Sequence, residues 1–158
     1  MLRLICTILA LLMLAATALP QQKEAPISPM THHAHGTFTV DMKPLTPPPA
    51  EGLSRFSIDK QIHGDLEATS KGEMFSGGDY KTGAAGYVAI EVVTGVLQGK
   101  RGTFALQQMA TMDSSGPKLS VVVVPGSGTG ELKGISGTFT ITIADGKHSY
   151  DLDYTLPA

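Results

Sequence analysis

Two glutamates and a tyrosine have the types and spacing for proton transfer. In an extended segment Tyr87, Ala89, Glu91 and Val93 share one face, so Glu91 lies among apolar neighbours. Desolvation in a cavity raises the pKa of a carboxyl group, which is a usual route to a general base. The candidate catalytic residues are therefore Glu91, Tyr87 and Glu73, acting on an apolar small molecule. The alternative is a set of mutually satisfied polar groups in a filled core.

Other polar and aromatic residues are candidates for holding a ligand. Near the C-terminus Tyr150 and Tyr154 alternate with Asp151 and Asp153, which predicts that the tyrosines point inward. A buried phenol needs a hydrogen-bond partner, and Glu91 or Glu73 is the expected one. The candidate ligand-binding residues are Gln107, Gln108, Phe104, Tyr150 and Tyr154.

The segment Thr31–His35 contains three histidines, which can hold a metal where the geometry closes around it. In an extended chain, however, His33 and His35 share a side and His32 points away. No cysteine or carboxylate lies within a few residues to complete a site. We expect a solvated flank, with no metal and no other cofactor.

The loop Gly126–Gly130 resembles a phosphate cradle only superficially. It lacks the following helix and the Lys-Ser/Thr pair of such loops, so a tight turn is expected. Ser127 and His148 could be imagined in a hydrolytic triad, but Ser127 is not in a Gly-x-Ser-x-Gly elbow. We therefore predict neither phosphate binding by this loop nor hydrolysis by Ser127 and His148.

The elements that must position these residues are β-strands. Gly-Thr-Phe occurs at residues 36, 102 and 137, and each copy opens a run with apolar side chains at every second position. Glycine-rich and Asp-rich turns separate the runs, and only the stretch 130–134 suggests a single helical turn. The predicted strands are 36–43, 53–62, 65–75, 85–97, 102–112, 118–124, 136–144 and 149–156.

An open antiparallel sheet of this size would leave two unpaired edges, and closure removes them. The predicted fold is an all-β, closed eight-stranded antiparallel β-barrel, whose interior is filled by side chains or holds one small ligand. A β-sandwich is the alternative.

The N-terminus predicts export. Arg3 precedes an apolar stretch from Leu4 to Leu14, and Ala16-Thr17-Ala18 forms a small-x-small cleavage site. We expect a signal peptide at 1–18, a flexible linker at 19–34 and a barrel domain at 35–158, in a periplasmic or secreted protein. A retained anchor is the alternative, although the apolar stretch is short for a membrane span.

The remaining charge excludes one class of partner. Without Arg3 the mature chain has 11 basic and 14 acidic residues, so no nucleic acid is expected.

Several motifs resemble a known family. Two of them are Ser-Gly-Thr-Gly-x-Leu-x-Gly at 127–134 and Gly-x-His-x-Tyr at 146–150. The others are the segments 85–89, 102–108 and 33–38. Over residues 30–158 the chain resembles the bacterial family catalogued as domain of unknown function 3224, grouped with allene oxide cyclase-like barrels. The resemblance implies a closed barrel of the calycin-like kind and, for the wider group, relatives that cyclise or position hydrophobic small molecules inside it.

The chain departs from the family pattern in two ways. Members of the family often have histidine where this chain has Gln108, and glutamine cannot serve as a general acid or base. They also tend to begin near the equivalent of Met30, without a leader.

Taken together, the sequence predicts an exported barrel that binds a small hydrophobic molecule. The first alternative is a cofactor-free isomerase or cyclase, for which Glu91→Gln would abolish turnover while leaving stability nearly intact. The second is a structural or protein-interaction barrel. Pairing of outer strands into a homo-oligomer is compatible with all three.

Overall fold

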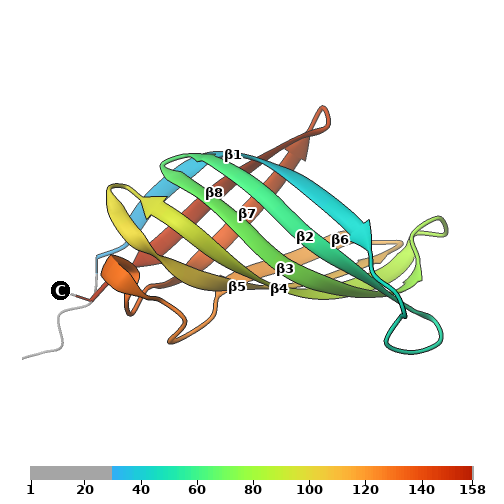
Figure 1. Ribbon diagram of the computed structural model, residues 1–158. Helices are drawn as coiled ribbons and strands as arrows, with labels where there is room; N and C mark the ends of the chain where they lie inside the picture. Colours follow the sequence, from blue (N-terminus) through green and yellow to red (C-terminus); the bar gives the residue numbers. More distant parts are fainter. Residues whose placement is uncertain (1–29, 158) are drawn as a thin grey trace, which may run out of the picture.

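The computed structural model describes residues 30–157; the predicted signal peptide and most of the predicted linker lie outside this range. Eight strands and one short 3-10 helix make up the fold (Figure 1). Within the described range no helix is long and apolar enough to cross a membrane. The elements are β1 (His32–Pro44), β2 (Leu53–Gly64), β3 (Leu66–Asp79), β4 (Ala84–Leu97), β5 (Lys100–Asp113), β6 (Gly116–Val123), η1 (Gly130–Leu132), β7 (Ser136–Ala144) and β8 (Lys147–Thr155).

The strands pair in chain order, each antiparallel to the next, and β8 pairs with β1 to close the barrel. The predicted fold class is therefore confirmed, and the β-sandwich alternative is excluded. The predicted single turn is also present, as η1. β1 begins at His32 and buries Ala34, so the last residues of the predicted linker belong to the strand.

Tight turns join most neighbouring strands. Gln98 and Gly99 have φ of 45° and 85°, and Asp145 and Gly146 have φ of 51° and 72°. Two consecutive residues with positive φ are typical of a type I′ turn, whose twist matches that of the flanking strands. These turns set the register of the β4–β5 and β7–β8 hairpins, which in turn decides the residues that face inward.

One end of the barrel, which we call the packed end, is filled by side chains. η1 and the loop around it cover this end, and Leu132 and Ile135 are almost fully buried there (Figure 1). They belong to one hydrophobic core in which aromatic and aliphatic side chains from the strands meet. The core includes Leu66, Leu97, Phe104, Phe139, Tyr150, Leu152 and Tyr154.

The opposite end, which we call the open end, is less tightly joined. β6 and β7 pair at one position, Val122 with Thr138, and β1 pairs with β8 only as far as Phe38 with His148. The tip of the β7–β8 hairpin therefore lacks ladder partners on both sides and projects beyond the barrel (Figure 1). At this end the barrel wall therefore has gaps between β6 and β7 and between β8 and β1.

β4 carries apolar side chains on both faces, as its sequence predicts. Ala89, Glu91 and Val93 are buried inside the barrel, whereas Val88, Ile90 and Val92 are exposed outside. The inward face of β4 brings Glu91 to the middle of the barrel, opposite Gly72 on β3. A Cβ at Gly72 would lie 2.5 Å from the Glu91 Cα, so glycine is required for this close approach.

Candidate functional site

A buried carboxylate organises the centre of the barrel. Glu91 is only 1% exposed and accepts hydrogen bonds from side chains of three other strands. Lys60 of β2 donates to Glu91 Oε1 at 2.5 Å, the Gln108 amide of β5 donates to the same oxygen, and the Ser70 hydroxyl of β3 donates to Oε2. We call these four residues the polar layer. Both carboxylate oxygens are thus occupied by protein donors.

The charges in the polar layer compensate one another. Lys60 is 5% exposed, and its ammonium group is held between the Glu91 carboxylate and the ring of Phe38, whose centroid lies 4.9 Å away. A cation over an aromatic face gains electrostatic energy, most of all where water is excluded. A buried ion pair costs desolvation energy, which its attraction and additional hydrogen bonds must offset. Ser70 and Gln108 supply those hydrogen bonds.

Tyr87 extends this network toward the open end. Its hydroxyl donates to Gln108 Oε1 across 3.4 Å, a long hydrogen bond. Burial raises the pKa of Tyr87, and the nearby Tyr80 and Glu91 raise it further. The phenol therefore keeps its proton at neutral pH and remains a donor.

An open-end cavity of about 300 Å³ lies above the polar layer. Its lining is mostly apolar and comes from all eight strands and the β3–β4 turn. Glu91 and Ser70 are not among the lining residues, so the cavity meets the polar layer at Lys60 and Gln108. The lining residues are Phe38, Val40, Met42, Ile58, Lys60, Met74, Tyr80, Tyr87, Gln108, Leu119, Ile141, Ile143 and His148.

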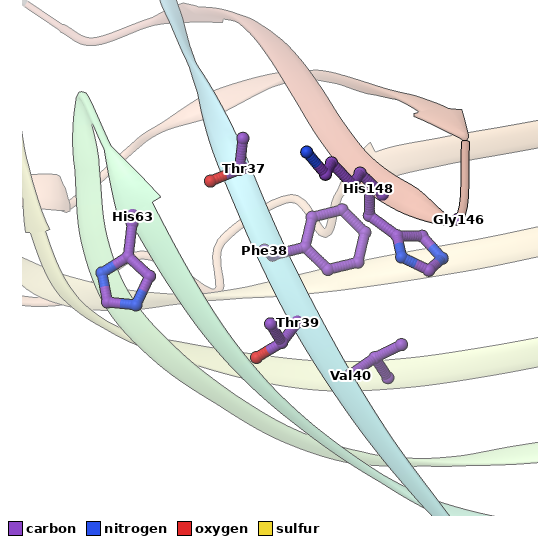
Figure 2. A pocket seen from close by; sticks show the side chains of 8 residues that line it. Thr37, Phe38, Thr39, Val40, His63, Gly146 and His148 are labelled. Atoms are coloured by element: carbon purple, nitrogen blue, oxygen red, sulfur yellow. The ribbon is translucent and has the colours of Figure 1, made fainter. Parts of the chain in front are cut away.

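A groove of about 420 Å³ runs beside this cavity, where β1 separates from β8 (Figure 2). Phe38, Val40 and His148 line both hollows, and the rings of Phe38 and His148 lie 4.9 Å apart between centroids. Figure 2 shows this pair beside the β7–β8 turn at Gly146. These side chains separate the cavity from the side of the barrel.

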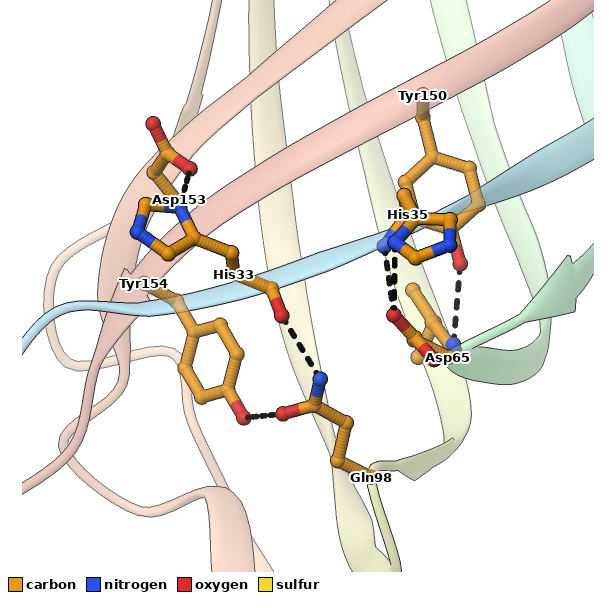
Figure 3. A network of polar contacts seen from close by, with 8 residues as sticks. His33, His35, Asp65, Gln98, Tyr150, Asp153 and Tyr154 are labelled. Atoms are coloured by element: carbon orange, nitrogen blue, oxygen red, sulfur yellow. Dashed lines mark hydrogen bonds and ion pairs between the residues drawn. The ribbon is translucent and has the colours of Figure 1, made fainter.

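Tyr150 and Tyr154 point inward as predicted, but they belong to the packed end. The Tyr150 hydroxyl accepts a hydrogen bond from the Leu66 backbone N–H at 3.0 Å, and the Tyr154 hydroxyl donates to Gln98 Oε1 at 2.8 Å (Figure 3). The expectation that Glu91 or Glu73 would pair with them is wrong. Burial raises the pKa of both phenols. Their hydroxyls thus join β8 to the start of β3 and to the β4–β5 turn at the packed end.

Three further candidates lie away from the cavity. Phe104 is buried in the packed core, and Gln107 is exposed on the outer face of β5. Glu73 is also outside, where it accepts two 2.7 Å hydrogen bonds from Arg55, which lower the pKa of its carboxyl group. Of the eight candidates, the structure therefore brings together Glu91, Tyr87 and Gln108.

The histidines of β1 interact with other residues of the chain. His33 contacts Asp153 at 2.6 Å and His35 contacts Asp65 at 3.2 Å, both on the outer face (Figure 3). His32 stacks on Tyr154. Across residues 30–157, no three His, Cys, Asp or Glu side chains are grouped so that they could hold a metal ion.

Ser127 has a local role. Its hydroxyl donates to the Val124 carbonyl and accepts from the Ala105 backbone N–H, which fixes the β6–β7 loop. His148 lies instead at the open-end cavity. The two residues do not form a catalytic pair.

Lys60 and Ser70 are not among the residues predicted from the sequence. Lys60 lies between Ile58 and Ile62 in a run of alternating residues, so period two places it on the inward face. Ser70 likewise shares its face with Leu66 and Met74. This parity could have identified both residues.

Comparison with known proteins agrees with the fold. The profile of the family described as "Protein of unknown function (DUF3224)" matches residues 34–154. A crystal structure of a DUF3224 protein of unknown function from Shewanella oneidensis MR-1 superimposes with a TM-score of 0.74 and 39% identity, covering 82% of this chain and 100% of that chain. No curated protein matches. The chain therefore belongs to the DUF3224 family.

Proposed function

We propose that this protein binds a small, largely apolar molecule in the open-end cavity. The observation that carries this proposal is the hollow itself, about 300 Å³ within a barrel whose other end is packed with side chains. Small-molecule sites are commonly mostly apolar concavities with a few converging polar groups, and this cavity has that composition. The gapped wall beside the β7–β8 hairpin offers a route for the ligand.

The alternative activity, a cofactor-free isomerase or cyclase, receives less support from the geometry. A general base needs a free oxygen within reach of the substrate, but both Glu91 oxygens accept protein hydrogen bonds, and Glu91 does not line the cavity. A purely structural barrel would have no need of a hollow end. Ligand binding accounts for the cavity without either difficulty.

The proposal includes export and kinship with allene oxide cyclase-like barrels. Both rest on the sequence, namely the leader at 1–18 and the family motifs. A carrier suits any aqueous compartment, because apolar molecules are poorly soluble in water.

The test is titration of the protein with N-phenyl-1-naphthylamine, a neutral apolar probe that fluoresces when it leaves water. Two matched variants locate the binding site. Ile143→Asp places a carboxylate at the cavity rim, and Ile90→Asp places one on the outer face of β4; the two isoleucines are 65% and 57% exposed. We expect Ile143→Asp to weaken binding about tenfold and Ile90→Asp to leave it unchanged. The opposite pattern would place the site on the outer face and overturn the proposal.

A further inference from the structure

The cavity floor offers hydrogen-bond donors. An ammonium group has three N–H bonds, and Lys60 donates one of them to Glu91. The Gln108 amide nitrogen has two N–H bonds, and one goes to the same oxygen. Both side chains line the cavity. Lys60 and Gln108 therefore keep N–H bonds that a ligand can accept from at the cavity floor, beneath apolar walls.

The strongest acceptor near this floor does not face the cavity. Glu91 is absent from the lining, and its oxygens accept from Lys60, Gln108 and Ser70. A ligand group that only donates hydrogen bonds would find only the neutral oxygens of Gln108 and Tyr87 in exchange for its water, and Gln108 Oε1 already accepts from Tyr87. A ligand group that accepts them would be satisfied.

The charge at the floor selects between two kinds of acceptor. Glu91 already neutralises Lys60, so a ligand carboxylate would add an uncompensated negative charge beside a buried carboxylate. Apart from Lys60, His148 is the basic side chain in the lining, and it lies toward the rim beside Phe38. A neutral acceptor avoids this cost.

We propose that the ligand is an apolar molecule with one neutral acceptor oxygen, such as a ketone or ester carbonyl, which binds with this oxygen toward Lys60 and Gln108 at the cavity floor. This inference rests on the proposed function. It makes Lys60 and Gln108 the residues that determine which head group is accepted, with the apolar side chains above them holding the hydrocarbon.

The experiment measures displacement of N-phenyl-1-naphthylamine by four compounds with a ten-carbon chain: 2-decanone, decane, decanoate and decylamine. We expect 2-decanone to bind about tenfold more tightly than decane, since it gains a buried hydrogen bond, and decanoate and decylamine to bind more weakly than 2-decanone. If none of the four displaces the probe, the proposed function fails. If all displace it equally, or if decanoate binds best, only the head-group inference is overturned.

A triple variant and a spectroscopic measurement test the floor directly. Lys60→Met with Glu91→Leu removes the ion pair as a unit, so no lone charge remains buried. Adding Gln108→Leu removes the other floor donor, and 2-decanone should lose its advantage over decane only in the triple variant. Infrared difference spectra of carbonyl-labelled 2-decanone need only the wild-type protein. A carbonyl band shifted to lower frequency than in hexane supports a hydrogen bond at the floor, and an unshifted band overturns it.

Discussion

The two ends of the barrel use the same alternating strands for different purposes. At the packed end, inward aromatic and aliphatic side chains meet, and η1 covers them. At the open end, the inward side chains of all eight strands surround a cavity of about 300 Å³, and the β7–β8 hairpin has few partners. Close packing and hollow space are thus separated along the barrel axis.

The polar layer lies between these two regions. Lys60, Ser70, Glu91 and Gln108 are buried, and only Lys60 and Gln108 reach the cavity. A hydrophobic layer could have filled this position at a lower desolvation cost. Under the proposed function, the polar layer instead gives the hollow end a floor that discriminates among ligands. The comparison therefore predicts different responses to substitutions in the layer, at the packed end and at the open end.

The largest effect is expected in the polar layer. Glu91→Gln leaves the Lys60 ammonium buried without its counterion, and breaking a buried ion pair in this way costs about 3–5 kcal/mol of unfolding free energy. The double variant Lys60→Met with Glu91→Leu should recover most of this loss. Urea unfolding at neutral pH measures both. A Glu91→Gln cost below about 1 kcal/mol would mean that Lys60 reaches water through the cavity.

The packed end should respond nearly as strongly. Leu132→Ala empties part of the core under η1, where Leu132 has no exposed surface, and should cost about 2–5 kcal/mol. Ile143→Ala at the open end is the matched control, and because that side chain is 65% exposed it should cost less than about 1 kcal/mol. Equal costs in chemical unfolding would contradict the division of the barrel into two ends.

The sequence predicted which residues face inward better than it predicted their height in the barrel. Period two correctly placed Glu91, Tyr87, Tyr150 and Tyr154 inside. Their position along the axis depends on strand tilt and on pairing between distant strands, which alternation does not encode. The Tyr150 hydroxyl therefore accepts a hydrogen bond from the Leu66 backbone N–H and does not pair with a carboxylate.

The same alternation could have assigned other residues to the correct face of the sheet. Gln107 and Glu73 have the opposite parity to their inward neighbours Leu106 and Met74, so alternation excludes them from the interior. Lys60 has inward parity, yet a lysine is rarely buried without a partner. Its partner Glu91 is on β4, two strands away, and only the closed fold brings them together. The expectation that Glu91→Gln would leave stability intact is therefore replaced by the prediction above.

The two ends should also differ in what their tyrosine hydroxyls contribute. Tyr150→Phe removes the acceptor of the buried Leu66 N–H and should cost about 1–3 kcal/mol. Tyr87→Phe removes only a 3.4 Å contact beside the cavity and should cost less than about 0.5 kcal/mol. Thermal unfolding of the two variants in parallel measures the difference. A larger loss for Tyr87→Phe would show that the open end is held together by its polar contacts.

The smallest effect is expected outside the barrel, where Arg55 and Glu73 form an ion pair exposed to water. Arg55 lowers the pKa of the Glu73 carboxyl below its ordinary value of 4.5, so the folded state favours the charged form. The resulting stabilisation is present above the ordinary pKa and is lost as the pH falls through the lowered folded value. Glu73→Gln should therefore destabilise the protein slightly at neutral pH, and the difference from wild type should shrink with acid and with added salt, because exposed pairs are screened. Urea unfolding across pH 7 to about pH 3, at low and high salt, measures this. A loss as large as that of Glu91→Gln would contradict the distinction between the exposed pair and the pair enclosed in the polar layer.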